Sequence, residues 1–362
     1  MNKNKILFII PYPIGQAPSQ RFRFEQYLSL LQEEHYTYRL ESFLDLKAWM
    51  VLYKKGNFVK KAIGITKGFF NRIMLVLEVW KYEYVFIHRE AAPLGPPVFE
   101  WIIAKLLKKK IIYDFDDAIF LPNTSENNKL IAGLKWHDKV SSICKWSYKI
   151  SCGNEYLADF AKKYNDSVVV NPTTIDTDHL HIPKINKYKE GDSEPIPIIG
   201  WTGSHSTMSY LKIIEPAIQS LQKKHVFTFR VISNHPPNLD VQNLEFVPWN
   251  KTTEIEDLSM IDVGLMPLED DIWAQGKCGF KCLQYMALGI PSVVSPVGVN
   301  NKIIAHGETG LFCKSEKDWV QNIEKLLENK MLRKSIGEKG RKRIEGYYSV
   351  NSNKHVFLKL FT

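Results

Sequence analysis

The clearest indication of the fold comes from residues 276–291, GKCGFKCLQYMALGIP. An apolar helical pattern begins near Phe280, and Gly289 and Pro291 follow it at positions typical of a helix end and the start of the next strand. The glycines before Phe280 allow a tight turn, and free N–H groups at a helix start attract anions. Lys277 and Lys281 add positive charge there. The stretch therefore predicts a strand–turn–helix unit that holds an anionic group such as a diphosphate.

Two further glycine turns follow predicted strands in the same half of the chain. One follows the run Pro197–Trp201 and the other follows Ser292–Val294. Because the carboxyl ends of parallel strands meet at one edge of a sheet, we expect all three turns to form one anion-binding site. The residues of the two further turns that we expect to contact the ligand are Gly203, Ser204, Gly298, Val299 and Asn300.

Short β-rich runs alternate with longer helical patterns along most of the chain. The helices predicted in the first half include Arg21–Leu31, Val98–Leu107, Leu130–Trp146 and Glu155–Lys163. The runs of the first half are Ile6–Ile10, Tyr84–Ile87, Lys110–Tyr113, Lys149–Ser151 and Val168–Val170. Those of the second half are Pro197–Trp201, Val226–Ile232, Leu244–Val247, Val263–Met266, Ser292–Val294 and Gly310–Cys313. Their near-continuous apolar character is typical of parallel strands covered on both faces. The pattern predicts an α/β protein with two doubly wound, Rossmann-like domains facing a central cleft.

The length of 362 residues also favours two domains, since a single hydrophobic core seldom grows to this size. We expect a first domain over 1–175, a turn-rich linker over 176–196 and a second domain over 197–340. The last segment, 341–362, has a helical pattern and is expected to pack back on the first domain.

The cysteines and the apolar runs indicate the compartment. The five cysteines are odd in number and lack paired metal-ligand spacing, which predicts reduced thiols and no bound metal. The opening run Ile6–Ile10 ends at Pro11 and is too short for a signal-peptide core. No stretch approaches the ~18 apolar residues of a membrane-spanning helix. We therefore expect a cytoplasmic protein that is not integral to a membrane.

Positive charge and aromatic residues gather in one N-terminal stretch. The chain carries a formal net charge of +9, and residues 54–77 mix lysines with phenylalanines and aliphatic residues. Such a stretch resembles a helix lying on an anionic bilayer, which predicts peripheral contact with the inner face of the cell membrane. The alternative is an amphipathic surface helix packed on its own domain. No recognised nucleic-acid motif appears, so no nucleic-acid partner is expected.

Several motifs together resemble one known family. The order of residues in 276–298, followed by 306–312 (HGETGLF), looks like the retaining glycosyltransferases of family 4, which have the GT-B fold. Residues 88–95 (HREAAPLG), 113–120 (YDFDDAIF) and 21–23 (RFR) are typical of a bacterial branch of it. The resemblance implies a nucleotide-sugar donor, no metal or other cofactor, a glycan or lipid-linked acceptor, retention of anomeric configuration and a role in surface polysaccharide assembly. Lys281 would stabilise the leaving diphosphate.

The chain departs from that family at two positions. The family's second-domain helix carries two glutamates separated by seven residues, the second of which holds the nucleotide ribose. Here these positions are Gly276 and Gln284. Gln284 is still able to hydrogen-bond hydroxyl groups through its amide, but it brings no charge. Asp270 or Asp271 is the nearest replacement for the first glutamate.

Three features of the first half are expected to face the cleft. The resemblance places the loop around Gly15 near the donor's diphosphate, and Arg89 and Glu90, which follow a buried strand, near the reacting sugar. Asp114 and Asp116 alternate along a strand and so are expected on one face of it. This pair is compatible with metal binding, with acceptor contact or general-base catalysis, and with a structural or helix-capping role. For Arg89 the alternative is structural pairing with Glu90 or Asp114.

Two other functions are compatible with the same pattern. A nucleotide-sugar epimerase of similar fold would bind the donor and need no acceptor. A non-catalytic protein that binds polyanions or polysaccharides would use the positive charge alone. The three glycine turns favour the transferase or the epimerase over the binding protein.

Overall fold

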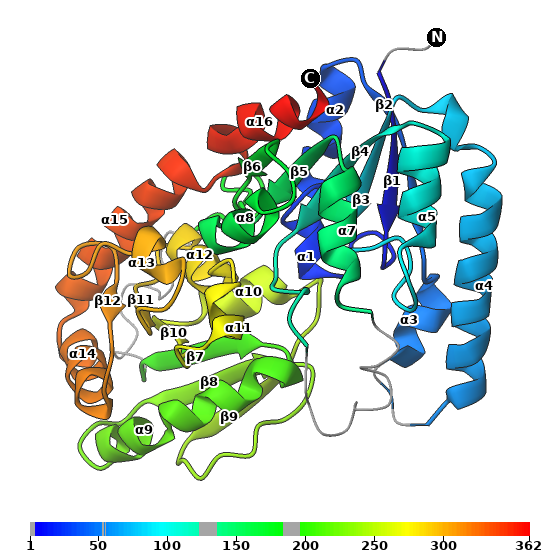
Figure 1. The fold of residues 1–362 in the computed structure, drawn as a ribbon. Coiled ribbons are helices and arrows are strands. Elements are labelled where there is room, and N and C mark those ends of the chain that lie inside the picture. Colours follow the sequence, from blue (N-terminus) through cyan, green and yellow to red (C-terminus); the bar gives the residue numbers. More distant parts are fainter. Residues whose placement is uncertain (1–3, 53, 55, 123–135, 184–195) are drawn as a thin grey trace. The chain divides into compact units, whose positions relative to one another are not determined.

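The computed structural model describes residues 4–52, 54, 56–122, 136–183 and 196–362 (Figure 1). Its internal contacts divide the chain into two compact units. Unit 1 comprises Met1–Thr173 and Asn353–Thr362, and unit 2 comprises Thr174–Ser352.

Unit 1 is built on a six-stranded parallel sheet in the order β2-β1-β3-β4-β5-β6. The strands are β1 Lys5–Ile10, β2 Thr37–Ser42, β3 Tyr84–His88, β4 Lys110–Phe115, β5 Lys149–Cys152 and β6 Val168–Val170. Every residue of β3 is buried, so helices or loops cover both faces of the sheet at its centre. The order reverses between β1 and β3, and open α/β sheets bind ligands at the carboxyl ends beside such a switch point.

The helices of unit 1 are α1 Pro18–Arg21, α2 Leu28–Glu33, α3 Leu46–Leu52, α4 Phe58–Val76, α5 Val98–Trp101, α7 Lys139–Trp146 and α8 Glu155–Lys162. The C-terminal helix α16, Val350–Leu358, enters this unit at Asn353. Its Phe357 stacks on Tyr27 with ring centroids 4.5 Å apart, and both side chains are fully buried. The end of the chain is therefore part of the core of unit 1.

Unit 2 contains a second six-stranded parallel sheet, in the order β12-β11-β10-β7-β8-β9. The strands are β7 Ile198–Gly203, β8 Thr228–Ser233, β9 Leu244–Pro248, β10 Val263–Met266, β11 Ser292–Val294 and β12 Leu311–Phe312. This is the doubly wound Rossmann order, with its switch point between β7 and β10. The two parallel sheets confirm the α/β fold class predicted from the sequence.

The helices of unit 2 are α9 Glu215–Gln222, α10 Glu254–Ser259, α11 Ile272–Gln275, α12 Phe280–Ala287, α13 Asn300–Ile303, α14 Glu316–Glu328 and α15 Lys330–Tyr347. Helix α15 packs directly on α12 and on the turn after it. A Cβ atom on Gly337 would lie 2.0 Å from the carbonyl oxygen of Gly289, so only glycine allows this approach. Arg341 donates to the carbonyl oxygens of Ala287 and Thr177. Helix α15 thus braces the C-terminal end of α12.

The predicted runs all became strands, but the sequence analysis missed β2. No residue of that strand is fully buried, because it lies at the sheet edge and Thr37, Arg39 and Glu41 are polar. The pattern at Arg21–Leu31 became three short helical pieces rather than one helix. Part of the helix expected at Leu130–Trp146 lies outside the described residues, and the described part is α7.

Candidate functional site

The start of α12 has the conformation that the glycine turn was expected to provide. Gly279 caps the helix with φ of +68°, a left-handed conformation that favours glycine. A Cβ atom there would also lie 2.3 Å from Cδ1 of Ile303. The eight-residue helix therefore begins abruptly at Phe280, with its first N–H groups and the positive end of its dipole at the turn.

Lys281 joins this helix start to the first glycine turn of the unit. Its Nζ atom lies 5.4 Å from the centre of the Trp201 ring, a cation–π contact. A Cβ atom on Gly203 would lie 2.9 Å from Cε of Lys281 and 2.5 Å from the Trp201 ring. The lysine side chain consequently passes over the end of β7, where a side chain at position 203 would displace it. Two predicted site residues, Lys281 and Gly203, are thus brought together.

Tyr285 fixes α12 beside the switch point of the sheet. Its hydroxyl oxygen accepts a hydrogen bond from the backbone N–H of Thr202 at 2.9 Å, near the end of β7. The same hydroxyl group lies 3.5 Å from the carbonyl oxygen of Leu265 in β10. The ring is fully buried, and burial raises the pKa of the phenol well above its usual range. The neutral Tyr285 therefore ties the helix to both strands that flank the switch point.

The other predicted residues of this unit take different places. Lys277 Nζ lies 6.0 Å from the centre of the Tyr210 ring. Gly298 has φ of +53° and turns the chain against the end of α11. Val299 precedes α13, and Asn300, which is 1% exposed, donates to the carbonyl oxygen of Ser295 at 3.0 Å. The side chain of Asn300 therefore supports its own turn.

Ser204 lies at the exposed end of the first turn, where a 3-10 helix begins at His205. Its hydroxyl group is 2.7 Å from that of Ser206. The backbone of the turn is held by Asn234, whose Oδ1 atom accepts from the N–H of His205 at 2.9 Å. Ser204 therefore offers an exposed hydroxyl group at the carboxyl end of β7.

Gln284 is paired with a residue that the sequence analysis did not single out. Its Nε2 atom lies 3.4 Å from Oε1 of Glu254, the first residue of α10. Gln284 is 2% exposed and Glu254 is 4% exposed. Position 284 itself has no carboxylate, but Glu254, 30 positions earlier in the sequence, places one beside it. Asp270 and Asp271, the nearest replacements for the first glutamate of the family, make other contacts. Asp271 caps α11, and Asp270 accepts a hydrogen bond from Gln275.

In unit 1 the loop around Gly15 is shaped by side chains that follow it. Gly15 has φ of +75°, and its N–H donates to Oε2 of Glu25 at 2.8 Å. Gln20, which is fully buried, accepts from the N–H of Tyr12 and donates to its carbonyl oxygen, both at 3.0 Å. The loop is therefore held in place at the carboxyl end of β1, beside the switch point of unit 1.

Asp114 lies in a buried network rather than on an open surface. Its Oδ1 atom accepts from Arg23 and from the hydroxyl group of Ser151, the latter at 2.6 Å. Its Oδ2 atom lies 2.8 Å from Nδ1 of His88. Asp114, Arg23 and His88 are each at most 1% exposed. Burial raises the pKa of Asp114, but the charge of Arg23 and the hydrogen bond from His88 outweigh this and hold it well below its usual range.

Arg89 and Glu90 form separate ion pairs at the end of β3. Arg89, with φ of +61°, donates from Nε and Nη2 to Oδ1 of Asp116 at 2.9 and 2.7 Å. Burial lowers the pKa of Arg89, but the nearby carboxylates of Asp116 and Asp117 raise it by a larger amount. The pKa therefore lies above its usual value, and the guanidinium group stays charged. Glu90 pairs with the buried Lys139 at 2.5 Å. Arg89 therefore pairs with Asp116, and not with Glu90 or Asp114, the two partners expected if its role were structural.

Four residues near these sites were missed by sequence reasoning or left without a role: Arg23, His88, Lys139 and Glu254. Each is a buried polar side chain beside a predicted site residue. Two of them carried a signal in the sequence: His88 directly follows four buried residues of a strand, and Arg23 belongs to the motif at 21–23. Within the described residues its Nε2 atom has no hydrogen-bond partner. Asp114 and Asp116 do not share a site: they contact different arginines.

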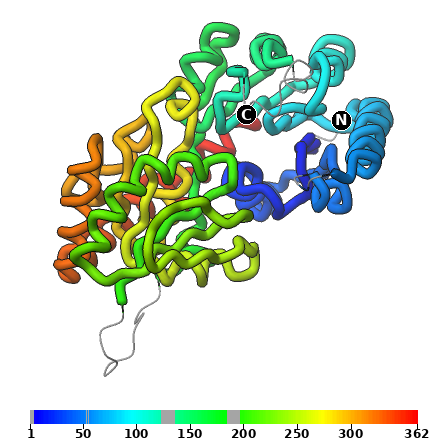
Figure 2. The backbone as a smooth tube through the Cα atoms, turned by 90° about the horizontal axis from the view of Figure 1, so that it is seen from below, coloured from blue at the N-terminus to red at the C-terminus, as the bar shows by residue number. Residues whose placement is uncertain are grey.

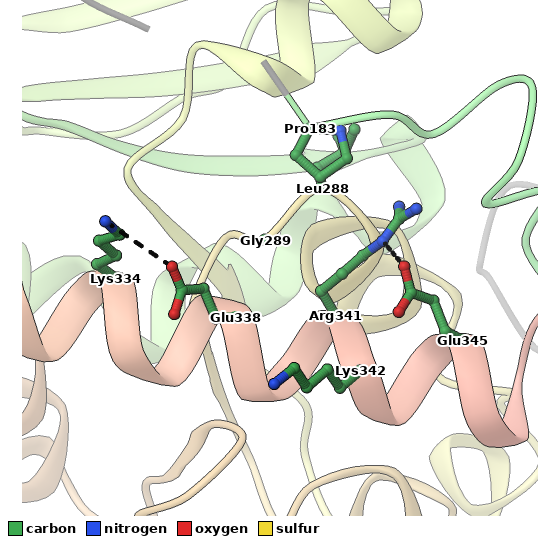
Figure 3. Close-up of a pocket in the computed structure, with 8 residues that line it drawn as sticks. All are labelled: Pro183, Leu288, Gly289, Lys334, Glu338, Arg341, Lys342 and Glu345. Atoms are coloured by element: carbon green, nitrogen blue, oxygen red, sulfur yellow. Dashed lines mark hydrogen bonds and ion pairs between the residues drawn. The ribbon is translucent and has the colours of Figure 1, made fainter. Parts of the chain in front are cut away.

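Two other features of unit 2 lie away from the start of α12. A surface pocket of 490 Å³ lies between α15 and the turn Leu288–Gly289, at the opposite end of α12 (Figure 3). Two ion pairs line it, Lys334 with Glu338 and Arg341 with Glu345. A second feature is a group of three side chains, His225, Glu324 and Glu328. It lies near the amino-terminal end of β8, whereas the glycine turns lie at the carboxyl ends of the strands. Neither feature coincides with the predicted anion site.

Comparison with known proteins agrees with this geometry. Residues 238–343, which include α12 and its lysines, match the family model described as glycosyl transferases group 1. No curated protein matches the chain. Among solved structures, a glycosyltransferase from Rickettsia africae has a TM-score of 0.69 at 16% identity, covering 100% of this chain and 98% of that one.

Two further solved structures share the fold over nearly their whole length. Sucrose-phosphate synthase from Thermosynechococcus elongatus has a TM-score of 0.64 at 12% identity, with 99% of this chain and 98% of that one covered. Anabaena HepE in complex with UDP-glucose has a TM-score of 0.63 at 13% identity, with 98% and 99% covered. The fold is GT-B. Together with the family match, it identifies the chain as an enzyme of the glycosyltransferase class.

Among the described residues, no helix has both the length and the hydrophobicity needed to cross a membrane.

Proposed function

We propose that the chain transfers a sugar from a nucleoside diphosphate sugar to a glycan or lipid-linked acceptor, with retention of anomeric configuration. The observation that carries the proposal is the position of Lys281. Its ammonium group lies over Trp201 and beside Gly203, at the start of α12 and next to the β7–β10 switch point. Similarity of fold to Anabaena HepE, which was solved with UDP-glucose, supports a nucleotide sugar as the donor.

The arrangement suits the departure of a nucleoside diphosphate. When the bond between the sugar and the phosphate oxygen breaks, negative charge develops on the leaving diphosphate. Fixed donors aimed at such charge usually supply the largest part of catalysis. Lys281 and the first N–H groups of α12 provide a positive charge and a helix dipole there. Lys277, Gly203, Ser204 and the turn at Gly298–Asn300 complete the donor site.

A metal ion is not required for this chemistry. The oxygens of Asp114 and Asp116 that an Asp-x-Asp metal site would use accept hydrogen bonds from Arg23 and Arg89. These pairings support a metal-independent reaction. In the donor site the lysines take the place that a divalent cation would have in neutralising the diphosphate.

The acceptor is proposed to bind at the carboxyl ends of the unit 1 strands. Arg89, Glu90 and Asp116 lie there, and their side chains are partly exposed. Glu90 and Asp116 are the carboxylates available to contact an acceptor hydroxyl group, and Arg89 orients Asp116. Asp114 has no exposed oxygen, and we assign it a positioning role through His88 and Arg23.

We also propose that the enzyme works in the cytoplasm, with part of its surface on the inner face of the cell membrane, in surface polysaccharide assembly. Four of the five cysteines are buried as free thiols, which supports a reducing compartment. A lipid-linked acceptor would be available at that membrane face.

A donor screen tests the proposed function. The purified chain is titrated with UDP-, GDP- and ADP-sugars in a calorimeter, and the tightest binder is then incubated with lipid-linked acceptors. We expect one nucleotide class to bind with a Kd between about 1 μM and 1 mM. Donor consumption should require the acceptor, and the anomeric coupling constant of the product should match that of the donor.

Two results would contradict the proposal in different ways. Conversion of the nucleotide sugar to an isomer without acceptor would assign the chain to the epimerases. Binding of polysaccharide or other polyanions without any nucleotide-sugar binding would assign it to the non-catalytic class.

A further inference from the structure

Helix α4 packs one face on the described part of unit 1 and exposes apolar side chains on the opposite face. Gly64, Gly68, Arg72 and Leu75 are buried and face unit 1. A Cβ atom on Gly64 would lie 2.6 Å from Cβ of Ala48, and one on Gly68 would lie 2.6 Å from the Phe43 ring. The glycines therefore let the helix lie close against α3 and fix which face points inward.

The opposite face of α4 carries a stripe of exposed apolar side chains, interrupted by Thr66. Its side chains are between 48% and 73% exposed, and they are Val59, Ile63, Phe70, Ile73, Met74 and Leu77. At 3.6 residues per turn these positions fall within about 100° of arc, opposite the buried glycines. In both Figure 1 and Figure 2, α4 runs along the margin of unit 1. An exposed apolar stripe of this length is unusual on a soluble monomer and marks an interaction surface.

Positive charge borders the stripe and identifies its partner. Helix α4 contains Lys60, Lys61 and Lys67 but no aspartate or glutamate. Lys60 and Lys67 are exposed and lie two turns apart, along one edge of the stripe. Lys67 pairs with Asp45 at 2.8 Å at the surface, so Lys60 carries the unbalanced charge of this edge. A helix with a wide apolar face and lysines at its border lies in the plane of an anionic membrane surface. The lysines then reach the lipid phosphates while the apolar side chains enter the boundary of the acyl chains.

We propose that the α4 stripe docks the protein on an anionic lipid bilayer. This deepens the proposed function, on which it rests for its biological role, because a lipid-linked acceptor lies in that bilayer. Two copies of the chain joined stripe to stripe would bring the Lys60 side chains together, and α4 has no carboxylate to pair with them. The charge therefore favours the lipid surface over a second copy as the partner.

Two elements that contact α4 also carry exposed apolar side chains. Leu46 and Met50 of α3, which contacts α4, are 50% and 59% exposed. Trp101 of α5, which also contacts α4, is 44% exposed. A tryptophan at the border of such a surface is suited to the polar headgroup region of a bilayer.

Flotation with vesicles tests the docking surface. The full-length protein is mixed with vesicles of phosphatidylglycerol in phosphatidylcholine, or of phosphatidylcholine alone, and centrifuged through a density gradient. We expect flotation with the anionic vesicles that decreases as salt is added. The double variant Phe70→Ser/Ile73→Ser should bind at least tenfold more weakly, since two large apolar side chains no longer leave water. Lys60→Gln should lower binding about fivefold.

Matched measurements separate this inference from the proposed function. Val226→Ser removes an apolar side chain that is 69% exposed in unit 2, and it should float like the unaltered protein. Nucleotide-sugar binding by the double variant in solution should be unchanged. If the unaltered protein floats with anionic vesicles but binds no nucleotide sugar, the proposed function is refuted while the docking surface stands.

Three outcomes would overturn the inference. One is failure of the unaltered protein to float, and another is equal flotation with neutral and anionic vesicles. The third is a dimer in light scattering that the double variant converts to a monomer without a change in lipid binding. That last result would assign the stripe to contact between two copies of the chain.

Discussion

Nδ1 of His88 lies 2.8 Å from Oδ2 of Asp114, and neither side chain is exposed to solvent. Because the pKa of Asp114 is held low, the carboxylate accepts and Nδ1 of His88 carries the proton. The pair joins the ends of β3 and β4, beside the proposed acceptor residues Arg89 and Glu90. The orientation of the His88 ring is therefore set by a charge that Arg23 balances.

Asp114→Asn should lower the free energy of unfolding by about 3–5 kcal/mol, because it leaves the buried Arg23 without its counter-charge. The depressed pKa of Asp114 contributes stability that is fully present above the unfolded value of about 3.9 and is lost as the pH falls below it. Urea unfolding between pH 7 and pH 2.5 measures this effect. The unaltered protein should lose stability faster with acid than the variant, and parallel curves would contradict the prediction.

Lys281→Ala should lower turnover about 10²–10³-fold, since it removes one fixed charge from the leaving diphosphate. The melting temperature should change little, because Lys281 is only partly buried. Lys281→Arg should restore part of the activity, as it keeps the charge. The control is Lys334→Ala on α15, where the lysine is 69% exposed and faces Glu338. Undiminished turnover of Lys281→Ala with a saturating donor would remove this lysine from the mechanism.

Gln284→Glu should destabilise unit 2 by about 1–3 kcal/mol at pH 8, because it places a second carboxylate beside the buried Glu254. The loss should be smaller at pH 5, where protonation of one carboxyl group relieves the repulsion. Gln275→Glu is the matched control, since Gln275 contacts Asp270 at an exposed position. Thermal unfolding at the two pH values compares the variants, and equal losses at both sites would refute the role of burial.

Gly337→Ala should separate α15 from the end of α12, because the new Cβ atom would lie 2.0 Å from the carbonyl oxygen of Gly289. We expect a loss of about 1–3 kcal/mol in the free energy of unfolding. Gly346→Ala lies in the same helix with nothing within 4 Å, and it should instead stabilise the protein by up to about 1 kcal/mol. Chemical denaturation measures the free energy of unfolding of both variants. If both substitutions raised it, or both lowered it, the packing argument would be contradicted.

The sequence was sufficient for features that depend on neighbouring residues. The strands β10 and β11 are short apolar runs bounded by polar or turn residues, and their predicted limits match the structure. The start of α12 was found from Gly279, whose left-handed conformation is a local requirement. Strand β2 was missed because an edge strand with Arg39 and Glu41 has no apolar run to detect.

The pairing of polar side chains could not be predicted, because the partners are far apart in the sequence. Arg23 and Asp114 are separated by 91 positions, and the spacing of Asp114 and Asp116 suggested one shared face. In the structure Asp116 lies beyond the end of β4 and pairs with Arg89. Likewise Glu254 meets Gln284 only because α10 and α12 pack beside each other. The individual roles of the site residues remain predictions for the variants above.

The two glycines of α4 have a practical consequence for work with this protein. Gly64 and Gly68 hold the inner face of the helix against Ala48 and Phe43, so folding depends on that face alone. The outer face is then open to redesign. Serine or glutamine at several stripe positions should yield a more soluble protein with an unaltered core, suited to concentration and crystallisation.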